Sequence, residues 1–314
     1  MRVAVLDDYQ DVVRRLDAFG LLDGHDVTVF TTAVGPERLA GVEALVLIRE
    51  RTRVDEVFLD RVPSLRLIAQ TGRLGPHVDA EAARARGIVV VDGGGSPVAP
   101  AELTWALVLA ATRRLPQYVE RLRAGEWQRN GLEGGPGALG HVLAGRTLGV
   151  VGLGRIGALV AGYGRAFGMD VRVWGREGSL ARAAAAGYGA ATSQRDLFAR
   201  ADVLSAHLPL RPETRGTITL DDLRAMRPSS LFVNTSRAAL VEPGALATAL
   251  AEGRPGFAAV DVFDEEPATA DPLVRLPNVV AAPHIGFVER DSYESYLGAA
   301  FAHVVAFASG RLGA

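Results

Sequence analysis

Two ionisable side chains in the last third of the sequence could handle a carboxylate and a proton. Arg237 follows the apolar run Leu231–Asn234, and His284 follows the apolar run Val279–Ala282. The planar fork of an arginine suits a carboxylate and does not lose its charge, and histidine titrates near neutral pH. This pair predicts chemistry on a small carboxylic acid with transfer of a proton, such as the reduction of a 2-keto acid.

A carboxylate beside the imidazole would fix its tautomer and favour its protonated form. The run Asp264-Glu265-Glu266 follows the preceding apolar run, Ala258–Val262, and offers three candidates for this role. Glu266 is our first choice, but sequence spacing alone leaves Glu265 and Asp264 as rivals.

A glycine motif indicates a binding site for a dinucleotide. Gly152-Leu153-Gly154-Arg155-Ile156-Gly157 lies between an apolar run, Thr147–Val151, and a helical pattern, Ala158–Phe167. Gly152 would allow a tight turn, Gly154 would leave room for the pyrophosphate, and Gly157 would let the helix approach the strand. The free amides and dipole of the helix N-terminus would then hold the phosphates.

The end of the second strand normally shows which dinucleotide binds. NAD sites have an acidic residue there to accept from the ribose 2'-hydroxyl, whereas this chain has Gly175 followed by Arg176. Arg176 could pair with a 2'-phosphate, which favours NADP slightly over NAD. Two alternatives stay open: Glu177 could bind the ribose, and Arg176 could be a solvated charge.

The composition limits the class of protein. A chain of 314 residues has room for two domains. It has no cysteine, and all 34 basic residues are arginine, which excludes thiolate chemistry, Schiff bases and a catalytic lysine, and no metal site is expected. The net charge of -2 predicts no nucleic-acid partner. Without a long apolar stretch or a signal-peptide pattern, we expect no membrane partner and a cytoplasmic location.

Short β-branched runs alternate with helical patterns throughout, which predicts an α/β fold with two doubly wound parallel sheets. The strands expected in the first sheet are Val3–Leu6, Val27–Thr31, Ala44–Ile48, Leu65–Ala69 and Ile88–Val91. The six expected in the second are Thr147–Val151, Val171–Trp174, Val203–Ala206, Leu231–Asn234, Ala258–Val262 and Val279–Ala282.

A stretch rich in glycine and proline, residues 92–100, precedes a helical pattern over Ala101–Arg114 and marks the crossing between domains. The helical segment Arg290–Ser309 lies beyond the last strand and could return to the first domain. The expected domains are therefore residues 1–98 with 288–314, and residues 99–287.

These motifs, in this order, resemble those of the D-isomer-specific 2-hydroxyacid dehydrogenase family over nearly the whole chain. The shared motifs are Gly72–Asp79, Arg86-Gly87-Ile88, Pro97–Glu102, Gly152–Gly157, His207-Leu208-Pro209, Glu213-Thr214, Asn234–Arg237, Asp261-Val262-Phe263, Glu266-Pro267 and Pro283–Gly286.

The resemblance implies a flavodoxin-like substrate domain, a Rossmann NAD(P)-binding domain and a D-stereospecific oxidoreductase acting on a small 2-keto or 2-hydroxy acid, similar to glyoxylate, hydroxypyruvate or phosphoglycerate. It also implies a homodimer. The catalytic residues would be Arg237, Glu266 and His284, since the family carboxylate directly precedes the proline. Residues expected to bind the cofactor are Gly152, Gly154, Arg155, Ile156, Gly157, Gly175, Arg176, His207, Pro209, Thr214, Thr235, Asp261 and Gly286. Residues expected to bind the substrate are Arg51, Thr71, Gly72 and Arg237.

The sequence departs from the family pattern in two places. Ala238 replaces the usual glycine after the arginine, and Phe287-Val288-Glu289 replaces small residues and threonine after the histidine, which puts the local substrate contacts in question. The charged loop Arg49–Thr52 could recognise a second anionic group on the substrate. The alternative function is that of a non-catalytic NAD(H)-sensing protein, similar to the corepressors among the family's relatives.

Overall fold

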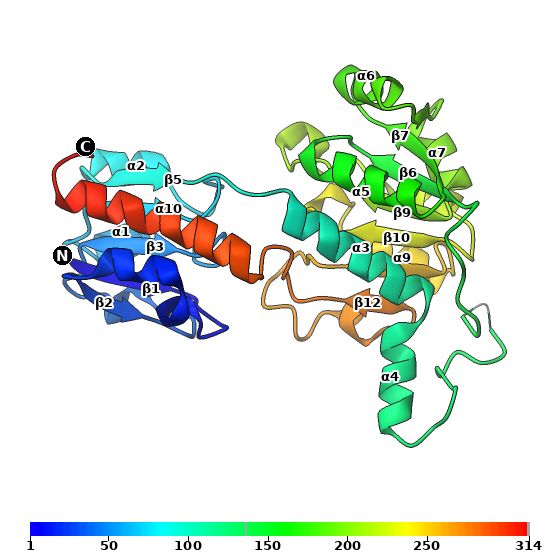
Figure 1. Cartoon of the computed structure of the whole chain (residues 1–314), viewed down its shortest axis with the longest axis horizontal. Coiled ribbons are helices and arrows are strands. Elements are labelled where there is room, and N and C mark those ends of the chain that lie inside the picture. The colour runs from blue at the N-terminus through cyan, green and yellow to red at the C-terminus, as the bar shows by residue number, and fades with distance from the viewer. Residues whose placement is uncertain (136, 313–314) are drawn as a thin grey trace. The chain divides into compact units, whose positions relative to one another are not determined.

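The computed structural model describes residues 1–135 and 137–312. The chain divides into two compact units, each built around one parallel sheet (Figure 1). Unit 1 comprises Met1–Ser96 and Val288–Ala314, and unit 2 comprises Pro97–Phe287. The first change of unit therefore falls after Ser96 rather than after residue 98.

Unit 1 contains a five-stranded sheet with the order β2-β1-β3-β4-β5, which is the order of flavodoxin-like folds. The central strands are buried along their whole length, because helices cover both faces of a parallel sheet. The strands are β1 (Arg2–Leu6), β2 (Asp26–Val29), β3 (Ala44–Leu47), β4 (Leu67–Gln70) and β5 (Val89–Asp92).

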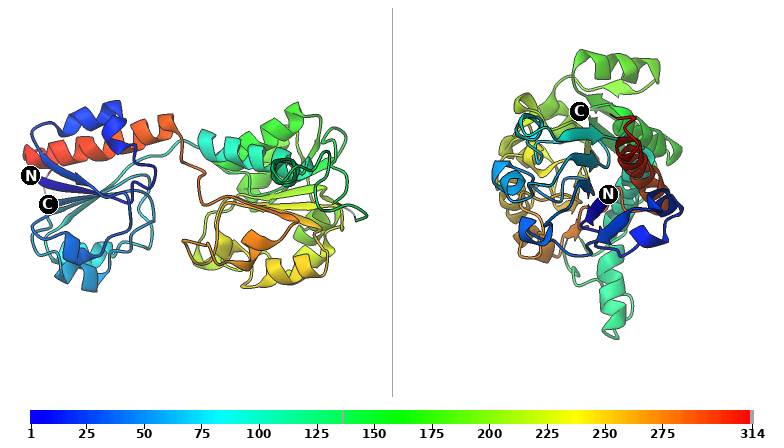
Figure 2. Two further views of the ribbon diagram at one scale, coloured as in Figure 1. Left: turned by 90° about the horizontal axis from the view of Figure 1, so that it is seen from below. Right: turned by 90° about the vertical axis from the view of Figure 1, so that its left-hand side faces the viewer.

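The helices of unit 1 form one layer on each side of its sheet (Figure 2, left). Helices α1 (Glu56–Asp60) and α2 (Ala80–Ala85) form one layer. Helix α10 (Arg290–Ala308) packs in the other layer against β4 and the short helix η2 (Asp17–Leu22). The α10 segment therefore completes the core of unit 1, although unit 2 precedes it in the sequence.

Unit 2 contains a seven-stranded sheet with the order β12-β11-β10-β9-β6-β7-β8. The expectation of six strands was wrong, because β8 consists of two residues at the edge, which are too few to give a sequence pattern. The strands are β6 (Thr147–Val151), β7 (Asp170–Trp174), β8 (Gly189–Ala190), β9 (Val203–Ala206), β10 (Leu231–Asn234), β11 (Phe257–Val260) and β12 (Val279–Ala281). The strand order reverses between β6 and β9, and ligands of doubly wound sheets bind beside such a switch point.

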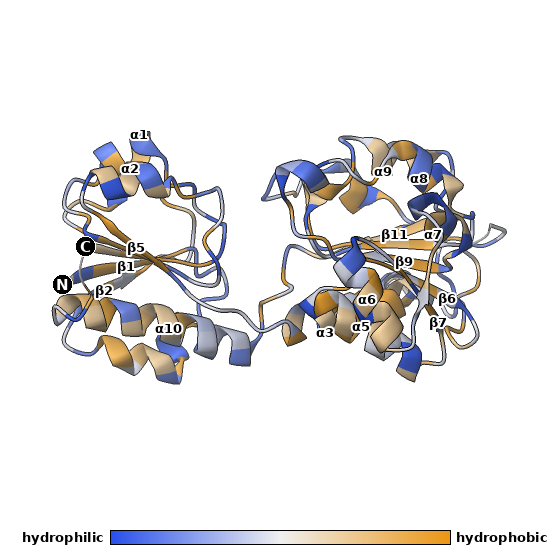
Figure 3. Cartoon of the chain, turned by 90° about the horizontal axis from the view of Figure 1, so that it is seen from above, coloured by the Kyte–Doolittle hydropathy of each residue, from blue (hydrophilic) through white to orange (hydrophobic). Residues whose placement is uncertain are grey.

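Helices cover both faces of this second sheet, and the hydrophobic residues of its strands lie between them (Figure 3). Helices α3 (Val98–Thr112) and α5 (Arg155–Ala166) pack together on one face, and α4 (Leu115–Arg123) follows α3. The remaining helices are α6 (Glu177–Ala185), α7 (Gln194–Arg200), α8 (Leu220–Ala225) and α9 (Ala245–Ala251).

Helix α3 begins three residues earlier than expected, at Val98 rather than at Ala101. Pro100 does not prevent this, because the first turn of a helix requires no backbone N–H donors. Across the described part of the chain, none of the helices combines the length and apolar character needed to cross a bilayer.

Candidate active site

The turn after β6 has the shape that a pyrophosphate group requires. Gly152 has a φ of 89°, which side chains rarely adopt. A Cβ atom on Gly157 would lie 2.3 Å from the carbonyl oxygen of Gly152, so only glycine lets α5 start this close to the turn. A Cβ atom on Gly154 would meet nothing within 4 Å, and this open space lies at the N-terminus of α5, where Arg155 and Ile156 are the first helical residues.

Two side chains of α6 hold this turn in place. Arg182 donates from Nε to the carbonyl oxygen of Leu153 at 2.7 Å, and Ser179 Oγ accepts from the Leu153 amide at 3.3 Å. Neither residue stands out in the sequence, since their role arises only when α6 packs beside the turn. A Cβ atom on Gly175 would lie 3.0 Å from the Cβ of Ser179. The close approach of α6 therefore explains the glycine at the position where NAD sites carry an acid.

The structure brings His284 and Glu266 together. The Nδ1 atom of His284 lies 2.7 Å from Oε2 of Glu266, whose other oxygen accepts from the Phe263 amide at 3.1 Å. Burial opposes ionisation of Glu266, but the hydrogen bond and charge of His284, the Phe263 amide and, to a smaller extent, the charge of Arg237 outweigh it, so the pKa of Glu266 lies below the usual value. Glu266 is therefore a carboxylate at neutral pH, and Nδ1 of His284 donates to it. The Nε2 atom takes no part in this contact.

The backbone places the imidazole through an unusual conformation. His284 has a φ of 52°, in the left-handed region that costs an ordinary residue about 1 kcal/mol or more. Asp261, at the end of β11, holds the loop in this shape because its two oxygens accept from the amides of Ile285 and Gly286 at 2.8 and 2.9 Å. Burial raises the pKa of Asp261 to about 6, although these amides oppose the shift. Asp261 therefore positions the histidine loop, whatever contact it makes with a cofactor.

Arg237 lies on a turn that Asn234 shapes at the end of β10. The Asn234 side chain donates from Nδ2 to the Arg237 carbonyl oxygen at 2.9 Å and accepts from the Ser236 amide at 3.1 Å. The guanidinium lies near enough to Glu266 to lower the pKa of that carboxyl group. The loops after β10, β11 and β12 thus bring a cation, a carboxylate and an imidazole to the carboxyl edge of the sheet.

Several other residues expected at the cofactor site stabilise the loops around it. His207 is buried and shares a 2.8 Å hydrogen bond with Ser205, and burial lowers its pKa to about 4, so its imidazole is neutral. Thr214 donates to the carbonyl oxygen of Pro209 at 2.7 Å and so closes the loop after β9.

The hydroxyl of Thr235 is also engaged within the fold. It lies 2.7 Å from the hydroxyl of Thr104, and Thr104 donates its own proton to the carbonyl oxygen of Pro100 at 2.7 Å. Thr235 therefore donates to Thr104, which links the loop after β10 to helix α3.

The residues expected to bind substrate in unit 1 surround the loop after β4. The Thr71 amide donates to the Leu47 carbonyl oxygen at 2.9 Å, and its hydroxyl donates to the same oxygen at 3.0 Å. Gly72, with a φ of 72°, packs directly against the guanidinium of Arg49. Arg51 donates to the carbonyl oxygen of Asp7 at 2.6 Å and stacks on Tyr9. The loop thus combines the Gly72 backbone with a cation, whereas Thr71 and Arg51 make contacts within the fold.

A doubly wound sheet with a glycine turn at its switch point defines a class of dinucleotide-binding proteins, and the cation, carboxylate and imidazole beside it are typical of oxidoreductases in that class. Comparison with known proteins identifies a family within this class. A family model described as "D-isomer specific 2-hydroxyacid dehydrogenase, NAD binding domain" matches residues 105–286.

Two curated enzymes and one crystal structure are similar in sequence to most of this chain. A glyoxylate reductase of Aeropyrum pernix is 40% identical over 83% of this chain and 78% of its own length. A D-3-phosphoglycerate dehydrogenase of Mycobacterium leprae is 41% identical over 84% of this chain, which spans only 48% of that protein. The crystal structure of a phosphoglycerate oxidoreductase from Vibrio cholerae is 53% identical, covers 99% of each chain and has a TM-score of 0.95.

The chain belongs to the D-isomer-specific 2-hydroxyacid dehydrogenase family. Unit 2 corresponds to the NAD-binding domain of this family, whose members are oxidoreductases that transfer hydride between NAD and small 2-hydroxy acids.

Proposed function

We propose that the protein reduces a small 2-keto acid, or oxidises the corresponding D-2-hydroxy acid, with unit 2 binding the dinucleotide and unit 1 binding the substrate. The observation that carries this proposal is the 2.7 Å contact between Nδ1 of His284 and Oε2 of Glu266. Arg237 lies close enough to lower the pKa of Glu266 and is therefore part of the same group. Such a group can hold an anionic substrate and supply a proton at one place.

The residues of the turn fit a bound dinucleotide. The space beside Gly154 and the amides at the start of α5 would receive the pyrophosphate. When bound, the reduced nicotinamide supplies the hydride for the keto carbon. Arg237 would hold the substrate carboxylate and polarise the carbonyl group, and Nε2 of His284 would give its proton to the carbonyl oxygen. Glu266 would stabilise the imidazolium before that transfer and keep the ring oriented afterwards.

A panel of 2-keto acids with NADH and NADPH tests this proposal, with the absorbance of the reduced nicotinamide as the readout. We expect oxidation of the cofactor with glyoxylate, hydroxypyruvate or a phosphorylated 3-carbon keto acid, and formation of the D-hydroxy acid. A protein that binds NADH but oxidises it with none of these acids would instead support the alternative function, an NAD(H)-sensing protein without catalysis.

We also propose a slight preference for NADP over NAD. Arg176 is exposed two residues after the end of β7, at the position that precedes the first turn of α6, and Glu177 beside it is exposed too. A guanidinium at this point would pair with a ribose 2'-phosphate, and Gly175 offers no carboxylate to accept from a ribose hydroxyl.

Replacement of Arg176 separates the two cofactors. We expect Arg176→Ala to raise the KM for NADPH by about 10-fold or more, as the loss of a charge-assisted contact implies, and to change the KM for NADH little. Steady-state kinetics with each cofactor gives the ratio, and Arg195→Ala, on α7, is the matched control. Equal losses with the two cofactors would reject the phosphate contact.

In unit 1 we propose that the amides of Gly72 and Arg73, with Arg49 beside them, bind an anionic group of the substrate. The Thr71 amide is engaged by Leu47, which leaves the two residues after it as the available donors of this loop. The guanidinium against Gly72 would also suit a second anionic group on the substrate.

We further propose that the protein is a homodimer that uses α4 and the segment after it. None of the residues of α4 is buried, and Leu115, Val119 and Leu122 form an exposed apolar stripe at helical spacing. In the following segment Trp127 and Leu139 are both 76% exposed. Exposed apolar surface of this extent is typical of protein interfaces, and a second copy is the partner that the family expectation favours.

Charge placed on this surface should separate the copies. We expect the wild-type protein to have twice the chain mass of 33.1 kDa by light scattering, and the double variant Leu122→Asp, Trp127→Asp to have the mass of a single chain. Val57→Asp, on the exposed side of α1, is the matched control and should leave the mass unchanged. A wild-type protein that is monomeric at all concentrations would contradict the proposal.

A further inference from the structure

A small pocket lies at the edge of the unit 2 sheet opposite the candidate active site. Val203, Leu231 and Phe257, which begin β9, β10 and β11, line it, whereas the glycine turn and His284 lie beyond the carboxyl ends of the strands. The space open to the centre of a water-sized sphere is about 10 Å³, so the pocket has room for about one group of that size. Thr112, at the end of α3, and the segment around His141 also line it.

Arg114 lines this pocket with a charge that is nearly inaccessible to solvent. The residue is 2% exposed, and its guanidinium lies over the ring of Phe257, 3.4 Å from the ring centroid. One terminal nitrogen donates to the carbonyl oxygen of Ala111. The buried Nε has no acceptor within residues 1–135 and 137–312. Burial of a guanidinium without a carboxylate is costly, and burial accordingly lowers the pKa of Arg114 to about 10.

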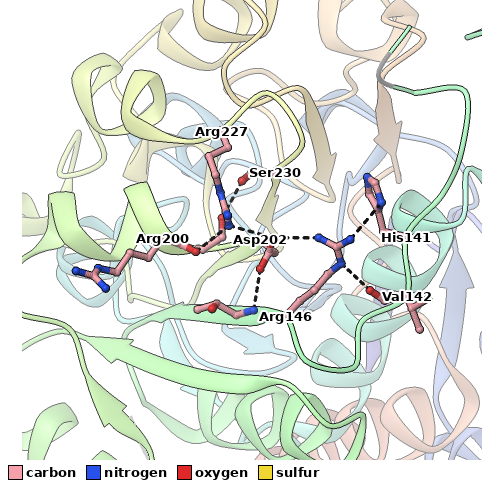
Figure 4. A network of polar contacts seen from close by, with 9 residues as sticks. His141, Val142, Arg146, Arg200, Asp202, Arg227 and Ser230 are labelled. Atoms are coloured by element: carbon pink, nitrogen blue, oxygen red, sulfur yellow. Dashed lines mark hydrogen bonds and ion pairs between the residues drawn. The ribbon is translucent and has the colours of Figure 1, made fainter. Parts of the chain in front are cut away.

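His141 contributes a second N–H group without an acceptor. Its Nδ1 lies 3.4 Å from a terminal nitrogen of Arg146 (Figure 4). Since an arginine can only donate, Nδ1 accepts. Burial and the charges of Arg146 and Arg114 lower the pKa of His141, so the ring is neutral and its single proton is on Nε2. This buried Nε2 likewise has no partner among the described residues.

The charges around the pocket do not balance. Asp202 is the carboxylate of this cluster: it accepts from Arg146 at 3.2 Å and from the Thr147 amide at 2.9 Å, and it forms an ion pair with Arg227 at 2.9 Å (Figure 4). Asp202 thus already pairs with Arg146 and Arg227, and among the described residues Arg114 has no carboxylate partner. A water molecule could accept from the two unpaired N–H groups, but it would leave this excess of positive charge.

We propose that the pocket binds a single halide ion, with chloride as the physiological occupant, held between Nε of Arg114 and Nε2 of His141. Of the common physiological anions chloride is closest in size to a water molecule, whereas phosphate, sulfate and carboxylates need more room. The ion would join the end of α3, the segment that leads into β6 and the start of β9. Its role would be to fix the base of unit 2 and the origin of α4, with no part in hydride transfer.

Anomalous diffraction locates the ion directly. Crystals of the full chain grown in or soaked with bromide should show an anomalous peak between Arg114 and His141, within about 3.5 Å of both nitrogens. A site filled by water, or by a carboxylate of another chain, with bromide found only at other arginines, would overturn the proposal. This test requires no variant and therefore does not depend on how substitutions affect folding.

Thermal unfolding measures what the ion contributes. In sodium chloride at about 0.2 M we expect the Tm to exceed that in sodium gluconate of equal ionic strength by about 2 °C or more, because a ligand that binds only the folded state stabilises it. The Arg114→Gln variant should lose this difference. Arg227→Gln is the matched control, because Arg227 contacts Asp202 but does not line the pocket, and it should keep the difference. An identical chloride effect in wild type and Arg114→Gln would also overturn the proposal.

Discussion

His284→Gln is expected to lower kcat for reduction of glyoxylate or hydroxypyruvate by about two orders of magnitude or more, because a positioned general acid contributes roughly that factor. The glutamine side chain can still hydrogen-bond to Glu266 but cannot give up a proton at neutral pH. Its dissociation constant for NADH or NADPH should stay near that of the wild type, since the glycine turn is untouched. Steady-state kinetics and cofactor fluorescence titration measure the two quantities.

Two further variants make this result specific. His303→Gln is the matched control, because His303 lies on α10 in unit 1 and is not one of the candidate site residues. This variant should retain normal turnover. Glu266→Gln should retain only partial activity, because the amide can still accept from Nδ1 of His284 but lacks the charge that would stabilise a transient imidazolium. Near-normal turnover of His284→Gln would remove the imidazole from the proposed mechanism.

Replacement of Arg237 should have the largest effect on kcat/KM. We expect Arg237→Gln to lower it by about 10³-fold, as found for the loss of a donor that stabilises developing negative charge. The loss should appear in both kcat and KM, because the guanidinium would hold the substrate carboxylate as well as polarise the carbonyl group. Cofactor binding should again be preserved.

The conservative variant Arg237→Lys tests why a guanidinium is present. A lysine retains the positive charge but lacks the planar fork, so we expect it to recover only a small part of the lost activity. Full recovery would show that charge alone matters. A loss in the glutamine variant confined to KM would indicate that the residue binds substrate without acting on the carbonyl group.

The sequence predicts the strands well where they are buried on both faces. Thr147–Val151, Val203–Ala206 and Leu231–Asn234 have the expected bounds, because β-branched and apolar runs of this length are typical of central parallel strands. The edge strand β8 was missed, since a glycine and an alanine carry no such pattern. Edges depend on pairing with a neighbour, here β7, which no local pattern records.

The candidate site shows the same division between local pattern and tertiary contact. Arg237 and His284 could be recognised from their types and from the strands before them. The carboxylate that partners the imidazole could not be identified from spacing alone, which left three acidic residues as candidates. The family pattern selected Glu266, and the structure brings that residue to His284. The roles of Asp261 and Arg182 in holding the loops depend on contacts between distant segments, and these have no local signature.

The division of unit 1 into two segments has a consequence for biosynthesis. Residues 97–287, which form unit 2, leave the ribosome as one continuous piece and can fold while residues 288–314 are still to be translated. Unit 1 must wait, because α10 packs against β4 and Glu294 on this helix accepts from the amides of Asp17 and Ala18. Until residues 288–314 are made, the face of the unit 1 sheet that α10 covers therefore lacks this helix, and its apolar residues stay accessible to solvent.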